Sequence, residues 1–241
     1  MKNVSFDIVI PSWNQKDLST NCLLSIQKFS KQYDYRVIWV DNGSDEDVFQ
    51  CMRSLLVSMS HVIIRNTKNI GFVKATNQGM QVADADFVVF MNNDTEAVPG
   101  WLGKLVAPML ADKKIALTGP RTTTKDSWQG NYNKKVKSTL ILPESAMLAF
   151  FCAMLRKDVI QKVGYLDECF GVGFGDDDDY CYRIKQQGHK LALVADVVIP
   201  HHHRSTFNLL YSEVEIKCMQ DTALELFFSK NKLRKSKWGM K

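Results

Sequence analysis

The chain has 241 residues, 45% of them apolar, and a formal net charge of +5 at pH 7. This length suits one large domain or two small ones, and the apolar content is ordinary for a globular protein with a buried core. No apolar run reaches the roughly 18–20 residues of a transmembrane helix. The apolar run at the N-terminus is too short and too interrupted for a signal peptide, so a cytoplasmic protein is expected.

The positive charge is concentrated in a basic tail, residues 230–241. Six of the 31 basic residues lie there, so the rest of the chain is nearly neutral. Such a tail can bind anionic lipid or nucleic acid, or it can be a solvated terminus without a partner. The six cysteines are scattered and form no C-x-x-C pair, which indicates reduced thiols.

In the first half of the chain, short apolar strands alternate with helices. The expected strands are 6–10, 35–40, 61–66, 86–94 and 115–120, and the expected helices are 16–29, 45–59, 73–83 and 101–110. Pro108 should end or kink the last helix. Nearly continuous apolar strands between helices are typical of parallel sheets. We therefore expect an α/β, Rossmann-like fold with a mixed, mainly parallel sheet flanked by helices.

The second half is less regular. Residues 121–145 are polar and basic without clear periodicity, which suits an ordered substrate loop or a mobile lid. After them we expect a strand at 146–155, helices at 156–164 and 180–188, one or two strands in 190–200 and a helix at 212–229. Without a repeat or a low-complexity linker, the prediction is a single domain, 1–229, with a nucleotide-binding half (1–120) and an acceptor and catalytic half (121–229).

Polar loops follow four of the predicted strands, and ligands bind at this edge of parallel sheets. The loops read PSWN (11–14), DNGSD (41–45), RNTKNIGF (65–72) and NNDT (92–95). Strand-ending loops are usually polar, but four in register, all rich in Asn or Asp, favour a nucleotide site.

The loop 92–95 and the histidine run 201–203 have side chains suited to metal binding. A carboxylate such as Asp94 can hold a divalent cation together with phosphate oxygens, although an Asx turn would use the same residue. In the run 201–203, a continuing strand would place His201 and His203 on one side, and imidazole binds divalent metals well.

Four consecutive carboxylates, Asp176 to Asp179, follow a glycine-rich loop. The free N–H groups and the dipole of a helix N-terminus stabilise one or two of them. Adjacent helix positions point in different directions, so the others must face solvent or a pocket. Neighbouring carboxylates raise one another's pKa, which suits a general base.

These motifs, in this order, resemble those of inverting nucleotide-sugar glycosyltransferases of family 2, which have the GT-A fold. The resemblance covers about residues 6–207. It rests on DIVIPSWN (7–14), VDNGSD (40–45), N-x-G-F with A-x-N-x-G (69–79), MNNDT (91–95), LDECF (166–170), the acidic stretch through YCYR (176–183) and HHHRST (201–206).

The resemblance implies a nucleotide-sugar donor site. Its residues would be Pro11, Ser12, Trp13, Asn14, Asp41, Asn42, Ser44, Asn69, Gly71, Phe72, Asn77, Asn92 and Asn93. Asp41 would contact the nucleobase, often uracil in this family, so a UDP-sugar is the expected donor. Asp94 matches the metal-binding aspartate of the family's D-x-D motif, and Asn92 replaces its first carboxylate. His201 or His203 would complete the shell of a Mn²⁺ or Mg²⁺ ion.

The resemblance also implies catalytic roles for the acidic run. The family motif E-D-x-D, aligned through Cys181 and Arg183, places Asp176 and Asp177 at the E-D pair and Asp179 at its last position. Asp177 would be the base that deprotonates the acceptor, whose oxygen attacks the anomeric carbon from the face opposite the nucleotide.

Other functions stay open from the sequence. A sugar-phosphate nucleotidyltransferase would show a glycine-rich loop after the first strand, and this chain has none. A non-catalytic nucleotide- or nucleic-acid-binding module on a glycosyltransferase-like fold would explain Asn92 and the basic tail. The expected acceptor is a glycan, but the tail and a basic loop could recruit a nucleic acid or, at a membrane surface, a lipid-linked acceptor; the loop residues are Lys125, Lys134, Lys135 and Lys137.

Overall fold

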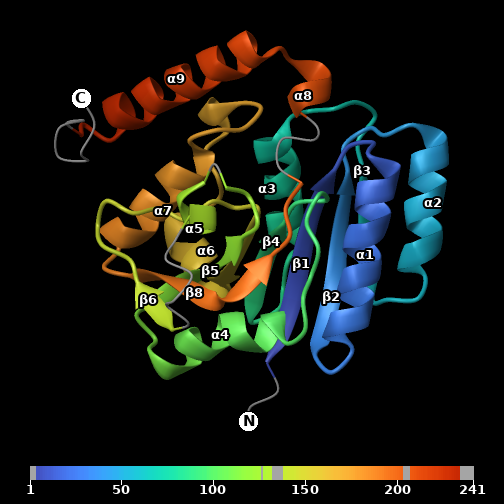
Figure 1. Ribbon diagram of the computed structural model, residues 1–241, viewed down its shortest axis with the longest axis horizontal. Helices are drawn as coiled ribbons and strands as arrows, with labels where there is room; N and C mark the ends of the chain where they lie inside the picture. Colours follow the sequence, from blue (N-terminus) through green and yellow to red (C-terminus); the bar gives the residue numbers. More distant parts are fainter. Residues whose placement is uncertain (1–3, 126, 132–137, 203–206, 234–241) are drawn as a thin grey trace.

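The computed structural model describes residues 4–125, 127–131, 138–202 and 207–233. They form one eight-stranded mixed sheet with helices on both faces (Figure 1). The strands, in chain order, are β1 (Ser5–Ser12), β2 (Asp34–Asp41), β3 (His61–Arg65), β4 (Phe87–Met91), β5 (Ile115–Thr122), β6 (Thr139–Ile141), β7 (Cys152–Arg156) and β8 (Lys190–Ile199).

The helices begin and end close to the predicted positions in the first half of the chain. They are α1 (Lys16–Ser30), α2 (Glu46–Leu56), α3 (Phe72–Val82), α4 (Trp101–Ala111), α5 (Trp128–Asn131), α6 (Lys157–Val163), the 3₁₀ helix η1 (Glu168–Phe170), α7 (Asp176–Gln186), α8 (Phe207–Leu210) and α9 (Glu213–Lys230). Among the described residues, none of these helices combines the length and the apolar composition needed to cross a bilayer.

The sheet has the order β3-β2-β1-β4-β7-β5-β8-β6. β1 pairs in parallel with β2 and β4, β2 with β3, and β5 with β8. β7 runs antiparallel between β4 and β5, and β6 runs antiparallel to β8. This arrangement confirms the predicted mixed, mainly parallel α/β sheet.

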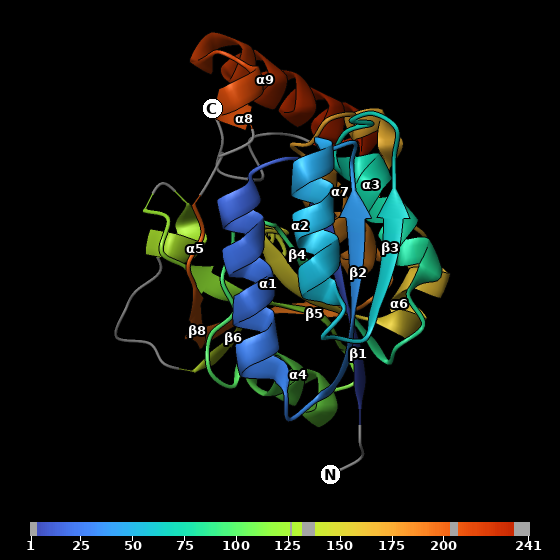
Figure 2. The ribbon, with the colours of Figure 1, turned by 90° about the vertical axis from the view of Figure 1, so that its right-hand side faces the viewer.

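Apolar side chains on both faces of the sheet explain the continuous apolar strands. Ile8 and Ile10 belong to the apolar cluster that includes residues of α1, α2 and α4, whereas Val9 belongs to the cluster that includes residues of α3, α7 and α9. Figure 2 shows α1 and α2 side by side in front of the first strands. A strand buried on both faces gives no alternation of polar and apolar residues.

One predicted strand is wrong in its extent, and one predicted helix break is absent. The strand expected at 146–155 exists only as β7, and residues 146–151 form a loop. Its apolar residues are buried by side-chain packing, since Phe150 stacks on Phe90 with the ring centroids 5.0 Å apart. α4 continues past Pro108 to Ala111, so the proline does not end this helix.

The first strands all finish at one end of the sheet. α8 and α9 lie across this end (Figure 1). The loops that carry the predicted motifs therefore meet beneath these two helices.

Candidate active site

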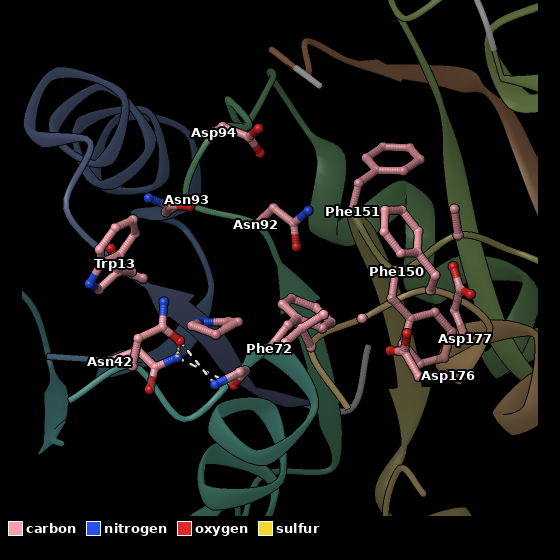
Figure 3. Close-up of a pocket in the computed structure, with 18 of the residues that line it drawn as sticks. Trp13, Asn42, Phe72, Asn92, Asn93, Asp94, Phe150, Phe151, Asp176 and Asp177 are labelled. Carbon is pink, nitrogen blue, oxygen red and sulfur yellow. Dashed lines mark hydrogen bonds between the residues drawn. The ribbon is translucent and has the colours of Figure 1, made fainter. Parts of the chain in front are cut away.

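A cavity of about 830 Å³ lies where β1, β2 and β4 end and α7 begins. Most of the predicted site residues line it: Pro11, Ser12, Trp13, Asn42, Asn69, Gly71, Phe72, Asn92, Asn93, Asp94, Asp176, Asp177 and His201. In Figure 3, Trp13 and Asn42 lie on one side of this pocket and Asp176 and Asp177 on the other, with Asn92 between them.

Asn42 ties the end of β2 to the loop before α3. Its amide donates a hydrogen bond to Asn69 Oδ1 at 2.9 Å, and its Oδ1 accepts one from the Ile70 N–H at 3.1 Å. Gly43 fits this close approach, because its φ is +84° and a Cβ there would lie 2.6 Å from the backbone of Lys68. The motif DNG thus gives this wall of the pocket its shape.

Three predicted donor residues, Asn14, Asp41 and Ser44, do not line the pocket but support it. Asp41 is fully buried, accepts a hydrogen bond from the Ser44 N–H at 3.1 Å, and lies 3.2 Å from Arg65 Nε. Asn14 accepts a hydrogen bond from the Asp45 N–H at 2.9 Å, while its own N–H donates to Ser44 Oγ at 2.8 Å. These contacts hold the two strand-ending loops against each other. Contact of Asp41 with a nucleobase stays a prediction.

Asn77 lies behind the pocket wall as well. Its amide donates to the Leu166 carbonyl and accepts from the Leu166 N–H, both at 2.9 Å. It therefore anchors the start of the loop that leads to α7.

A candidate metal site lies at the end of β4. His201 Nε2 is 3.3 Å from Asp94 Oδ1, and an antiparallel bridge between Thr95 and His201 brings these two side chains together. Asp94 is only 8% exposed, yet Asp94 Oδ1 and Asn92 Oδ1 are buried without a hydrogen-bond partner among the described residues. A carboxylate, an amide oxygen and an imidazole fit a divalent cation such as Mn²⁺ or Mg²⁺.

The protein supplies few charged ligands at this site. The part of the chain that the structure describes contains no group of three or more His, Cys, Asp or Glu side chains placed to hold a metal. Donor phosphates would have to complete the shell. His202 lies beside Glu96, with His202 Nε2 3.4 Å from Glu96 Oε1, and His203 lies outside the described residues.

The acidic run opens α7, which begins at Asp176, four residues before the helix expected at 180–188. Asp176 and Asp177 line the pocket, and Asp177 Oδ1 accepts a hydrogen bond from the Asp178 N–H at 2.9 Å. Loss of hydration, reinforced by the Asp177 charge, raises the pKa of Asp176 well above its usual range. Loss of hydration also raises the pKa of Asp177, against the effect of hydrogen bonds from backbone N–H groups. The two carboxyl groups therefore titrate together at a higher pH than ordinary aspartates.

Asp178 and Asp179 are not among the residues that line the pocket. Burial, with the Asp177 charge as a second cause, raises the pKa of Asp178 to about 7. Asp179 is fully buried, and its oxygens bind Arg183 Nε and Lys230 Nζ, each at 2.7 Å. Asp179 was predicted to be catalytic together with Asp176 and Asp177, but the structure places it in an ion-pair cluster outside the cavity.

Several aromatic and basic residues that the motifs do not predict as site residues also line the pocket. They are Lys68, Lys74, Phe150, Phe151, Phe174 and Tyr211. Phe151 stacks on the His201 ring with the centroids 5.0 Å apart, so it supports the metal candidate. The pair Phe150 and Phe151 was assigned to a strand because it lies in a continuous apolar run, and only the end of that run pairs with β4.

Comparison with known families identifies the class. The model of the family "Glycosyl transferase family 2" matches residues 7–164, and the chain therefore belongs to this family. The curated relatives include a chondroitin synthase of Pasteurella multocida (strain Pm70), 25% identical over 231 residues that cover 78% of this chain and 23% of the relative. A hyaluronan synthase of Pasteurella multocida is 27% identical over 242 residues, which cover 83% of this chain and 25% of the relative. The chain thus spans about a quarter of the length of these two relatives.

Solved structures show the same fold. GalNAc-T7, solved with UDP, GalNAc and Mn²⁺, superposes with a TM-score of 0.70 at 17% identity over 83% of this chain and 44% of that one. The mannosyltransferase PcManGT from Pyrobaculum calidifontis, solved with GDP-Man and Mn²⁺, superposes with a TM-score of 0.71 at 17% identity. The match covers 94% of this chain and 63% of that one. The predictions of family 2 and of the GT-A fold are confirmed.

Proposed function

We propose that this chain transfers a sugar from a nucleoside-diphosphate donor to an acceptor hydroxyl, with inversion at the anomeric carbon. One observation carries the proposal: a single pocket is lined by Asp94 and His201 and also by Asp176 and Asp177 (Figure 3). Displacement of a diphosphate needs stabilisation of the leaving group and a base for the attacking hydroxyl. The pocket offers residues suited to both tasks.

The donor would lie along the wall formed by Trp13, Asn42 and Asn69. The indole ring can pack on a planar base, and the amides can bind ribose and phosphate oxygens. Lys68 and Lys74 on the same wall add positive charge near an anionic ligand. We propose UDP as the nucleotide, in keeping with the UDP that the GalNAc-T7 structure contains and with the family resemblance.

Asp94, His201 and the Asn92 side-chain oxygen would hold a Mn²⁺ or Mg²⁺ ion. When bound, the ion would neutralise the charge that develops on the leaving diphosphate. Mn²⁺ accompanies the nucleotide in the structures of both solved relatives named above, which supports this assignment.

Asp177 would take the proton from the acceptor hydroxyl as its oxygen attacks the anomeric carbon from the face opposite the nucleotide. Its raised pKa makes the carboxylate a stronger base than an ordinary aspartate. Burial and the Asp177 charge raise the pKa of Asp176 as well, so Asp176 would orient and tune the base.

The acceptor would be a glycan. Phe150 and Phe174 lie in the lining near the acidic pair, and Tyr211 lines the same cavity. Aromatic side chains pack well against the apolar faces of sugar rings. A lipid-linked or nucleic-acid acceptor recruited by the basic tail stays a prediction, as does attachment to a membrane surface. The tail residues 234–241 lie outside the described residues.

A thermal-shift screen tests the donor site first. UDP, GDP, dTDP and CMP would each be added with Mn²⁺ or with EDTA, and Mn²⁺ alone would serve as the control. A ligand that binds only the native state raises its melting temperature, so UDP with Mn²⁺ should give the largest shift. The absence of a shift with any nucleotide would contradict the proposal and favour a module without donor turnover.

A further inference from the structure

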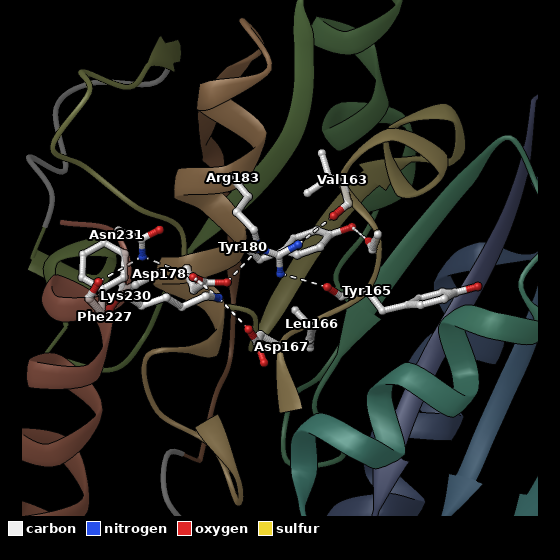
Figure 4. Close-up of polar contacts among 12 residues, drawn as sticks. Val163, Tyr165, Leu166, Asp167, Asp178, Tyr180, Arg183, Phe227, Lys230 and Asn231 are labelled. Atoms are coloured by element: carbon white, nitrogen blue, oxygen red, sulfur yellow. Dashed lines mark hydrogen bonds and ion pairs between the residues drawn. The ribbon is translucent and has the colours of Figure 1, made fainter. Parts of the chain in front are cut away.

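Lys230, the last residue of α9, bridges Asp167, which precedes η1, and Asp179, the last aspartate of the acidic run. Its Nζ atom lies 2.7 Å from Asp167 Oδ2 and 2.7 Å from Asp179 Oδ1 (Figure 4). Asn231 adds a hydrogen bond from Nδ2 to Asp179 Oδ1 at 3.3 Å. The end of α9 therefore holds residues on both sides of the loop between η1 and α7.

This loop carries one wall of the pocket. Val172, Gly173 and Phe174 line the cavity, and Phe174 adopts a φ of +73°, which is unfavourable for a residue with a side chain. Phe174 is followed by Gly175 with a φ of +75° and then by the acidic pair. A strained loop of this kind keeps its shape only when the surrounding structure fixes it.

Asp179 closes the first turn of α7. Its N–H donates to the Gly175 carbonyl at 2.9 Å, so the turn between them contains Asp176 and Asp177. The Asp179 side chain is fully buried and is held by Arg183 Nε from within α7. Arg183 in turn donates to the carbonyls of Val163 and Tyr165 at 2.8 Å, ahead of the loop.

The cluster is balanced in charge, with two carboxylates, Asp167 and Asp179, facing two cations, Arg183 and Lys230. Arg183 Nε and Lys230 Nζ bind different oxygens of Asp179. Of the two cations, only Lys230 also binds Asp167, at the start of the loop. A single ammonium group thus joins the two ends of the loop and restricts its conformations.

We propose that Lys230 is a positioning residue for sugar transfer. By binding Asp167 and Asp179 at once, it would fix residues 168–178, which comprise η1, the loop after it and the start of α7, with Asp177 directed at the acceptor. This inference rests on the proposed role of Asp177 as the base. It assigns to the C-terminal helix a part in catalysis although Lys230 does not line the pocket. The family model that matches the chain ends at residue 164, well before this helix.

The test compares Lys230→Met, Lys230→Arg and Lys217→Met in the full chain. Lys217 lies on the same helix in an exposed ion pair with Asp221, so it is a matched control for loss of a lysine charge. Hydrogen exchange of peptides covering 168–178 reports on the loop, and calorimetry gives the Kd of UDP with Mn²⁺. Release of UDP from a UDP-sugar gives kcat.

In Lys230→Met, exchange within 168–178 should speed up by about tenfold, with peptides from β1 and β4 unchanged. Turnover should fall by about tenfold or more while the Kd of UDP stays within about twofold, because base placement is lost and the donor wall is intact. Lys230→Arg should bring the exchange rate and kcat back towards their wild-type values, and Lys217→Met should leave both quantities unchanged.

Wild-type exchange in Lys230→Met would overturn the inference, and so would a loss of UDP affinity equal to the loss of kcat. If Lys230→Met does not fold, Asp167→Asn provides the test, since this partly exposed side chain is the other half of the bridge. Hydrogen exchange within 168–178 at the wild-type rate in Asp167→Asn would also overturn the inference. A wild-type chain that turns over no UDP-sugar would instead contradict the proposed function, and the exchange measurement would still decide the role of Lys230.

Discussion

Asp94 and Asp179 are both buried carboxylates, but their surroundings are opposite. Asp179 is enclosed by Arg183, Lys230 and Asn231 and is fully shielded from water. Asp94 lies at the edge of the cavity, and its Oδ1 atom has no hydrogen-bond partner among the described residues, although His201 Nε2 lies 3.3 Å away. The protein thus supplies partners for both oxygens of Asp179, whereas Asp94 Oδ1 receives no hydrogen bond from the described residues.

The difference indicates a structural role for Asp179 and a ligand-binding role for Asp94. A buried charge costs free energy unless it is paired, and the protein itself pairs Asp179. At Asp94, Oδ1 has the His201 ring 3.3 Å away but no hydrogen bond from the described residues, which is a reason to expect a cation from solution. The contrast also distinguishes Asp177, which lines the cavity, from Asp179, which follows it by half a turn and does not.

The largest effect is expected from Asp177→Asn. Loss of the base should lower kcat by about 10²–10⁴-fold, because the amide cannot accept the acceptor proton. The Kd of UDP with Mn²⁺ should stay nearly unchanged. Asp178→Asn is the matched control, with the same substitution in the same turn outside the pocket lining. Turnover of a UDP-sugar at the wild-type rate by Asp177→Asn would remove Asp177 as the base.

Arg183→Met tests the structural role of the Asp179 ion pairs. Removal of one partner from a buried ion pair costs about 3–5 kcal/mol of stability, and here Lys230 and Asn231 remain on Asp179, so about 3 kcal/mol is expected. Urea unfolding measures the change, with the exposed Arg53→Met as control. A loss of stability no larger than that of the control would mean that the cluster is not structural.

Asp94→Asn tests metal binding by the Asp94 carboxylate. The affinity for UDP in the presence of Mn²⁺ should weaken by about 10–100-fold, and the affinity in EDTA should not change. Glu96→Gln is a nearby control outside the pocket lining. Equal affinities of Asp94→Asn and wild type with Mn²⁺ would place the metal elsewhere.

The smallest effect concerns the pH dependence of stability. The pKa of Asp178 is about 7 in the folded chain against an ordinary value of 3.8, so folding favours its protonated form. Its stabilising contribution is complete below pH 4 and is lost as the pH rises through 7. Asp178→Asn should therefore raise the free energy of unfolding at pH 8 by about 1–3 kcal/mol and have little effect at pH 4. Parallel pH profiles of variant and wild type would contradict this expectation.

The sheet and the polar end of each strand could be predicted from the sequence. Runs such as VIWVD and DFVVFM are apolar on both faces and end in polar loops, so they indicate buried parallel strands with a ligand edge. Asn42, Asp94 and Asp177 follow from this placement together with the family motifs, and all three line the pocket.

The separate role of Asp179 could not be predicted. In sequence it is one of four equal aspartates, and the contact that distinguishes it comes from Lys230, which lies 51 residues away. Phe150 and Phe151 show the same limit. Their apolar run predicted a strand, but contacts with Phe90 and His201 bury them in a loop. Such packing depends on long-range contacts that local periodicity does not report.

The bridge between Thr95 and His201 has a kinetic consequence. It joins the end of β4, in the first half of the chain, to the residues that follow β8 near the end of the sheet. Asp94 and His201 can therefore come together only after β8 has been placed. During refolding, Mn²⁺-dependent nucleotide binding should therefore appear no earlier than the protection of β8 amides from hydrogen exchange.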